Sequence, residues 1–383
     1  MAKLPRESPS RKGTYYVLEQ TDTFFPNHPN RRRILAQLLN VPAALLALVE
    51  LEPASSADPP KKSPLVPTPS KHIDLEEYQN TLRLYWFHRH AGTTIEKVIR
   101  DIRLRIDKLH GHVLYVSTPQ KRHMIRLLCG YQILLGDIAQ EQQCWTAAQR
   151  YFANAIILAH EKDLPNLHVI ALFRRMAFFD DLENGEAALD NFAPARKLLE
   201  HVPSQLQGKI LASAATAQAR IARDDKTLTR ALNQCDEASK LIGQSTDDDF
   251  MFSMAFDQER YLLDRAATFM APTSKKLRAP QKAQDLLDKA AKEHFINIQR
   301  SSAYRQAYSD LIQAKIYFDQ GYDPVTITSA ESVLTTLKEL GSGIHLNSVE
   351  SLVKGLKERD PHNMELANLE LALMKLKQPY LFH

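Results

Sequence analysis

Apolar residues recur every three or four positions along most of the chain from Asp74 onward. Leu75, Tyr78, Leu82 and Trp86 begin this pattern, which places apolar side chains on one face of an α-helix. Pro, Gly and an Asp run separate further segments of the same period. These segments predict helices over 119–141, 145–162, 166–182, 186–201, 205–223, 226–242, 250–270, 280–294, 299–320, 324–340, 346–358 and 362–377. No stretch has the sustained alternation of a strand, so the sequence predicts an all-α fold.

Every second predicted helix, from 145–162 to 324–340, carries a triplet of a small, a large and a small apolar residue, in steps of four and three positions. The first copy, Ala148, Phe152 and Ala155, follows a Leu-Gly pair at 135–136. Further copies, some degenerate, are Ala188, Phe192, Ala195; Ala231, Cys235, Ala238; Ala283, Leu287, Ala290; and Ala330, Leu334, Leu337. A generic helical bundle could share this spacing through amphipathicity alone. Five copies in phase with the helix breaks favour a repeat array of antiparallel helix pairs.

The first 72 residues differ in composition from the rest of the chain. Residues 1–13 are polar, basic and contain proline, which predicts a disordered tail. Residues 14–52 predict a small helical unit. Residues 53–72 are rich in Pro and Ser, which is typical of a linker. The sequence therefore predicts a helical repeat domain over 73–383, preceded by a small helical unit, a linker and a tail.

The net charge of +4 is unevenly distributed. Residues 1–126 carry +8 and residues 127–383 carry −4. A basic N-terminal region could face nucleic acid, and Arg31, Arg32 and Arg33 are the candidates for phosphate contact. Three cations at a helix start oppose the helix dipole, which is consistent with a bound anion. The alternative is a solvated helix start beside a flexible tail.

The composition argues against most catalytic classes. Only 12 of 383 residues are Gly, so Gly-rich phosphate loops are not expected. Cys129, Cys144 and Cys235 are scattered and form no CxxC pair, and no nucleotide-binding, zinc-protease or hydrolase motif occurs. We therefore expect a non-enzymatic protein without cofactor or metal. The longest apolar run covers residues 41–49, well short of the roughly 20 residues that span a membrane, which predicts a cytoplasmic protein.

Two segments resemble known families. Residues 127–377 resemble a divergent tetratricopeptide-repeat domain, which implies a superhelical solenoid. Residues 14–49 resemble the end of the first domain of bacterial Xre/Cro-type helix-turn-helix regulators that carry a C-terminal repeat array. The matching residues are Thr14, Glu19, Phe25-Pro26, Arg31–Arg33, Leu35-Ala36, Leu38-Leu39 and Pro42–Leu46.

The helix-turn-helix itself looks truncated in this sequence. In such regulators a complete motif precedes the matching segment, whereas thirteen residues precede it here. Base readout needs a recognition helix supported by a second helix. The resemblance therefore implies a regulator-like protein whose isolated chain binds DNA weakly and without sequence preference.

The resemblance also implies where a partner would bind. Tetratricopeptide arrays bind peptides or proteins on a concave surface formed by the first helix of each pair. The corresponding positions are Asp137, Gln140, Phe173, Asp180, Thr216, Arg220 and Arg223, and each could equally be an ordinary solvated residue. Three functions stay open: a peptide-responsive regulator, a protein-interaction scaffold with no link to DNA, and an enzyme with an unrecognised site. A homodimer also remains open.

Overall fold

The computed structural model describes residues 73–88, 95–113, 115–243, 256–296 and 303–377. The chain divides into two parts between Thr68 and Pro69, and all of these residues belong to the second part. The predicted tail, helical unit and linker over 1–72 lie outside the described residues, and so do Arg31, Arg32 and Arg33. The proposed phosphate contact of these arginines therefore stays a prediction.

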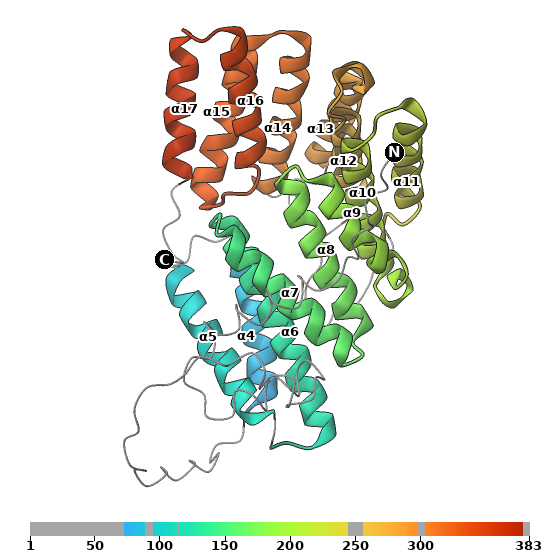
Figure 1. Ribbon diagram of the computed structural model, residues 1–383, viewed down its shortest axis with the longest axis vertical. Coiled ribbons are helices and arrows are strands. Elements are labelled where there is room, and N and C mark those ends of the chain that lie inside the picture. The colour runs from blue at the N-terminus through green and yellow to red at the C-terminus, as the bar shows by residue number, and fades with distance from the viewer. Residues whose placement is uncertain (1–72, 89–94, 114, 244–255, 297–302, 378–383) are drawn as a thin grey trace, which may run out of the picture. The chain divides into compact units, whose positions relative to one another are not determined.

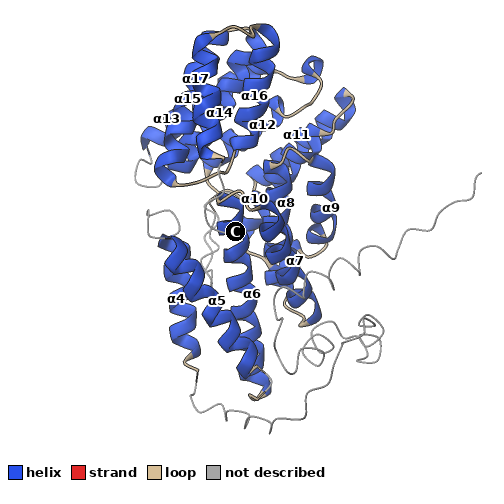
Figure 2. Cartoon of the chain, turned by 60° about the vertical axis from the view of Figure 1, so that its left-hand side comes forward, coloured by secondary structure: helices blue, strands red, loops and turns tan. Residues whose placement is uncertain are grey.

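Fourteen α-helices and two short 3₁₀ helices make up the described residues, which contain no strand (Figures 1 and 2). The predicted all-α fold is confirmed for this part of the chain. The α-helices are α4 (Leu75–His88), α5 (Ile95–His112), α6 (Thr118–Glu141), α7 (Trp145–Glu161), α8 (Pro165–Asp181), α9 (Gly185–Arg196), α10 (Ser204–Arg220), α11 (Asp225–Ser239), α12 (Gln258–Met270), α13 (Pro280–Ile296), α14 (Ala303–Gln320), α15 (Asp323–Leu340), α16 (Leu346–Arg359) and α17 (Met364–Leu376).

From α6 onward, neighbouring helices contact each other as pairs. The pairs are α6 with α7, α8 with α9, α10 with α11, α12 with α13, α14 with α15, and α16 with α17. The first helices of successive pairs are also in contact, from α6 to α8 and onward to α16. We call α6, α8, α10, α12, α14 and α16 the even-numbered row.

The helix pairs close around the small–large–small triplets predicted from the sequence. All fifteen triplet positions are buried. In the first pair, a Cβ added to Gly136 would lie 2.5 Å from the Phe152 ring, so only glycine lets α6 approach α7 this closely. A glycine also lies against a phenylalanine ring along the even-numbered row, at Gly208 of α10 with Phe256 before α12 and at Gly355 of α16 with Phe318 of α14.

Helix ends differ from the prediction where the backbone lacks a donor. The predicted helix over 186–201 ends at Arg196, and a separate 3₁₀ helix follows at Leu199–His201. Pro194 lies inside α9, and proline cannot donate a helical hydrogen bond. The chain therefore tightens, and Leu198 N–H donates to the carbonyl of Ala195 only three residues earlier.

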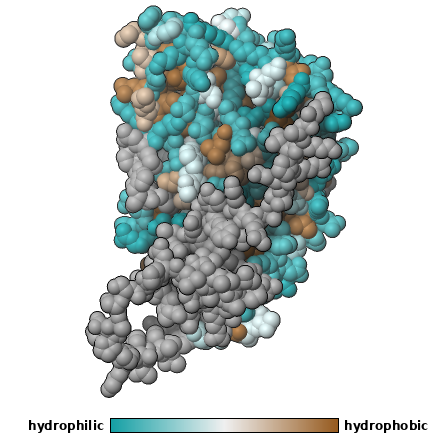
Figure 3. All heavy atoms as spheres, viewed as in Figure 1, coloured by the Kyte–Doolittle hydropathy of each residue, from teal (hydrophilic) through white to brown (hydrophobic). Residues whose placement is uncertain are grey.

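The last helix has apolar residues on two faces. α17 buries Leu366, Leu369 and Leu373, while Met364 and Leu371 remain exposed. Figure 3 shows apolar patches over these C-terminal helices, at the upper left of the view. Among the helices of the described residues, none is both long and apolar enough to cross a bilayer.

Candidate functional site

Successive helices of the even-numbered row are connected by polar side chains. Each contact joins a pair of helices that follow one another in the row, at donor–acceptor distances of 2.8 to 3.2 Å. We call this series the polar ladder. Its contacts are Asp137–Arg174 (α6–α8), Asp180–Arg220 (α8–α10), Lys209–Asp264 (α10–α12), Glu259–Arg305 (α12–α14) and Lys315–Ser348 (α14–α16).

Three of the residues predicted to line a binding surface belong to the ladder. The structure brings Asp180 and Arg220 together, 3.0 Å apart, although 40 residues separate them. Asp137 instead pairs at 2.8 Å with Arg174, a residue that the sequence did not indicate. The guanidinium of Arg174 also lies over the Trp86 ring, 4.9 Å from its centroid.

The other four predicted residues lie beside the ladder. Gln140 is buried, and its side-chain amide lowers the pKa of the nearby Asp181 carboxyl. Phe173 is buried among apolar side chains, and Thr216 is buried with its hydroxyl 3.2 Å from that of Thr268. Arg223 is exposed, three residues beyond the end of α10 at Arg220. A ligand would therefore meet Arg223 directly, whereas it would meet the buried residues only through their neighbours.

Three turns near the ladder share an unusual backbone conformation. Gln143, Asp163 and Glu183 lie 20 residues apart, each directly after a helix, with φ values of 57°, 51° and 56°. Glycine is the usual residue at this left-handed position, and a side chain there costs roughly 1 kcal/mol. The corresponding turns after α14 and α15 do use Gly321 and Gly341.

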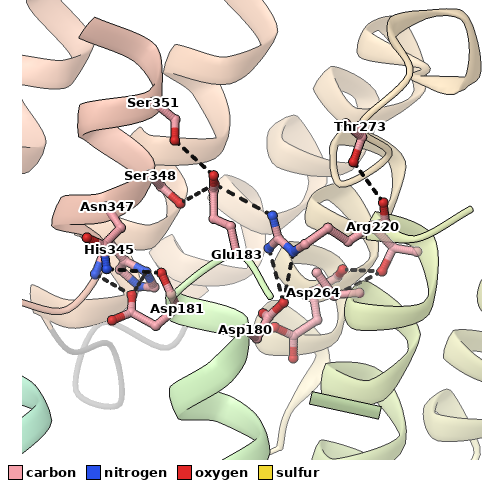
Figure 4. Close-up of polar contacts among 12 residues, drawn as sticks. Asp180, Asp181, Glu183, Arg220, Asp264, Thr273, His345, Asn347, Ser348 and Ser351 are labelled. Atoms are coloured by element: carbon pink, nitrogen blue, oxygen red, sulfur yellow. Dashed lines mark hydrogen bonds and ion pairs between the residues drawn. The ribbon is translucent and has the colours of Figure 1, made fainter. Parts of the chain in front are cut away.

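Glu183 reaches from its turn to three helices of the even-numbered row, and Figure 4 shows it beside Arg220, Ser348 and Ser351. Its Oε1 accepts hydrogen bonds from Ser348 at 2.9 Å and from Lys315 at 3.3 Å, and its Oε2 accepts one from Ser351 at 2.9 Å. The Arg220 guanidinium lies 3.6 Å from Oε1. Burial raises the pKa of Glu183, but Lys315, Arg220 and the two hydroxyls outweigh burial and lower it to about 2.

Asp181 makes a second connection between α8 and α16. Its Oδ1 accepts a hydrogen bond of 2.7 Å from the backbone N–H of His345, and lies 3.6 Å from Nδ1 of the same residue. Its Oδ2 is buried without a hydrogen-bond partner. Burial raises the pKa of Asp181 to about 7, so this carboxyl holds its proton at mildly acidic pH.

His345 continues the network toward α12. Its ring stacks on the Tyr308 ring, with 5.2 Å between the ring centroids. The Arg260 guanidinium also lies over the Tyr308 ring, 4.6 Å from its centroid. Arg260 in turn pairs with Asp264 at 2.8 Å. Burial and the nearby cations Arg260, Lys315 and Lys209 lower the pKa of His345 to about 3, so its imidazole is neutral.

The turn after α6 approaches the C-terminal helices in the same way. The side-chain amide of Gln143 donates to the carbonyl of Leu376 at 2.9 Å. Gly343 N–H donates to the carbonyl of Glu141, and a Cβ on Gly343 would lie 2.8 Å from that oxygen. The turns at Gln143 and Glu183 therefore both contact the C-terminal helices through direct hydrogen bonds.

Several of these charged groups are deep but still reached by solvent. Burial is the largest influence on the pKa values of Lys315 and His345, and it lowers both. Yet Lys315 and Glu183 keep 22% and 28% of their side chains accessible. Ser348 is buried whereas Ser351 is exposed, so the group around Glu183 extends from the interior to the surface.

Asp137, Asp180 and Arg220 of the ladder are among the residues that the sequence indicated, whereas Glu183 and Lys315 are not. A signal for Glu183 was present, because the helix breaks at 143, 163 and 183 recur every 20 residues without a glycine. No comparable signal marks Lys315, which is one of many lysines on amphipathic helices.

The described residues contain no group of three or more side chains arranged to hold a metal ion. No protein-family model matches the chain, and no curated protein and no solved structure matches it either.

Proposed function

We propose that the protein is a binding protein of the tetratricopeptide-repeat type, which holds a peptide or a segment of a partner protein against its even-numbered row. In this interpretation the helix pairs are antiparallel and stack into a superhelical solenoid. The first helices of such arrays form the concave binding surface. The protein would act by binding and not by catalysis.

The polar ladder is the observation that carries this proposal. Burying charged pairs between helices costs desolvation energy, and apolar residues of similar volume are often at least as stabilising. A row of charged pairs along α6 to α14 is therefore poorly explained by stability alone. Asp180, Arg220 and Lys315 keep 26%, 14% and 22% of their side chains accessible, and such charged groups can recognise an extended peptide.

The experiment that tests this function uses the full chain and a display library of random peptides. Enriched peptides are measured by fluorescence polarisation against the wild type, Arg220→Gln and Arg230→Gln. Losing one charge-assisted hydrogen bond should weaken binding by about 10- to 100-fold, so we expect this loss for Arg220→Gln. The matched control Arg230→Gln, exposed on α11 and outside the even-numbered row, should change affinity less than about twofold, because solvated surface charges contribute little.

Two results would contradict the proposed site. Equal affinity of the wild type and Arg220→Gln, with unchanged thermal unfolding, would place the peptide elsewhere. Failure to enrich any peptide, combined with cross-linking of a folded partner protein to these helices, would favour a protein-interaction scaffold.

A regulator-like role would add a weak contact with DNA through Arg31, Arg32 and Arg33. Phosphate contacts give affinity that falls steeply with salt and carries no sequence information. Binding of labelled duplexes at low and moderate salt should therefore be independent of sequence, and replacing the three arginines with alanine should flatten the salt dependence. A tight, sequence-selective complex at physiological salt would contradict this expectation.

A further inference from the structure

We propose that Arg220, Lys315, Ser348 and Ser351 form a carboxylate-binding site, which Glu183 of the same chain occupies in this structure and which a carboxylate of the bound peptide occupies in its place. The peptide as ligand rests on the proposed function, whereas the carboxylate site itself does not. Glu183 would then compete with the ligand from within the chain.

The donors converge from three separate helices on one carboxylate. Arg220 ends α10, Lys315 lies in α14, and Ser348 and Ser351 lie one turn apart in α16. Two hydroxyls and one ammonium donate to the two oxygens of Glu183 at 2.9 to 3.3 Å, as Figure 4 shows for the hydroxyls. Cations combined with hydroxyl donors are the groups that bind a carboxylate in proteins, whatever chain carries it.

The charge balance requires an anion at this place. Arg220 has a second carboxylate partner, Asp180, at 3.0 Å. Of the described carboxylates, only Glu183 lies within 4.0 Å of Lys315. If Glu183 left, Lys315 would be a deep cation without a paired carboxylate, which is strongly unfavourable. An incoming carboxylate removes that penalty, so departure of Glu183 and arrival of a ligand are coupled.

The turn that carries Glu183 is suited to exchange. Glu183 is held in a left-handed conformation that glycine would adopt at lower cost. The contacts with α14 and α16 offset this cost, and they are lost together if the side chain leaves. Ser351 is exposed and Glu183 keeps 28% of its side chain accessible, so a carboxylate can enter from solvent.

Asp163 provides a matched control within the same chain. It occupies the equivalent position one helix earlier, with φ of 51°, and it is exposed. Replacing either residue with glycine relieves the same backbone cost. Only Glu183→Gly also empties the carboxylate site, so the difference between the two variants isolates the site.

The test measures thermal unfolding of the full chain at pH 7 in acetate or in chloride of equal ionic strength. We expect Glu183→Gly to unfold at a lower temperature than Asp163→Gly, and acetate to raise the unfolding temperature of Glu183→Gly alone. The double variant Glu183→Gly/Lys315→Met should lose the response to acetate. If Glu183→Gly does not fold, Glu183→Asn serves instead, because asparagine tolerates the left-handed turn and leaves room for formate.

The proposal is overturned if acetate and chloride act alike on the unfolding temperature of Glu183→Gly, or if acetate acts equally on all variants.

Peptide affinity provides a second readout. Removing the internal competitor should tighten binding by about tenfold or more, since apparent affinity scales with the fraction of accessible sites. Unchanged affinity in Glu183→Gly would also overturn it. Amidated peptides and peptides with Asp or Glu replaced by amides distinguish a terminal from a side-chain carboxylate. If no peptide binds at all, the acetate experiment still decides whether the site exists.

Discussion

The interface inside each helix pair and the interface along the even-numbered row are built from different side chains. Inside the first pair, Gly136 and Ala148 let two helices approach, and Phe152 fills the space between them. Along the row, charged groups such as Lys209 and Asp264 connect the helices. The two interfaces share the helices of the even-numbered row. Each of α6, α8, α10, α12 and α14 therefore packs against the other helix of its pair and also carries a charged side chain that contacts a neighbouring helix of the row.

This difference separates what holds the helices together from what a ligand could use. Apolar burial is the main stabilising contribution in folding, and the pair interfaces supply it. Buried ion pairs contribute little net stability, but losing one partner is costly. We therefore expect mutations in the two interfaces to differ in size, in pH dependence and in the effect of conservative changes.

The largest effect is expected from Phe152→Ala. The ring is fully buried between α6 and α7, and removing a buried phenylalanine ring costs about 3–5 kcal/mol. Phe192→Ala in α9 should behave similarly. Urea denaturation measures the change, and Leu371→Ala on the exposed face of α17 is the control. A loss below about 1 kcal/mol at both phenylalanines would contradict the proposed packing.

Asp264→Asn should destabilise the charged interface by about 3 kcal/mol, because it leaves Lys209 and Arg260 without their carboxylate. Asp264 is 2% exposed and contacts both cations within 2.9 Å. The control is Glu370→Gln, which removes an exposed partner of Lys357 and should cost less than about 1 kcal/mol. Urea denaturation measures the free energy of unfolding of both variants. Equal losses of stability would show that burial of the Asp264 carboxylate does not raise the cost of removing its charge.

A third prediction concerns the pH dependence that Asp181 gives to the fold. Its pKa is about 7 in the folded protein and about 3.9 when unfolded. The folded state therefore binds the proton more tightly, and this stabilising contribution is lost as pH rises toward 7. The groups facing Asp181 are His345, Gln140, Asp180 and Glu183; the two carboxylates raise its pKa further.

Asp181→Asn removes this titration. The stability difference between wild type and variant should shift by about 2–3 kcal/mol in favour of the variant between pH 5 and pH 8. Urea denaturation of both proteins at the two pH values measures it. Parallel pH profiles would mean that Asp181 is ionised across this range in the folded protein.

The smallest effect is expected from Gly136→Ala. A Cβ there would lie 2.5 Å from the Phe152 ring, and overpacking of this kind costs about 1–3 kcal/mol. Gly111→Ala in α5 is the control, since nothing lies within 4 Å of a Cβ at that position, and alanine there should stabilise slightly. Stabilisation in both variants would show that α6 and α7 are not held at the distance described.

The sequence predicted the helices and the triplets that pack them because both depend on local spacing. The packing role of Leu135-Gly136 and of the triplet alanines can be predicted from residues within one helical turn or one pair of helices. Asp180 and Arg220 were also indicated, because the predicted repeat places residues of successive first helices on one surface. The helix end at Arg196 was missed because the effect of Pro194 competes with an otherwise continuous apolar pattern.

Only the tertiary structure brought Glu183 to Lys315, Ser348 and Ser351. Glu183 and Ser348 are 165 residues apart, and their contact depends on how every intervening pair packs on the next. Small changes in each packing angle add up over such a distance, and no local pattern records their sum. The sequence by itself thus determined the elements and their apolar faces, whereas the placement of charges across the row was decided by the accumulated geometry of the whole array.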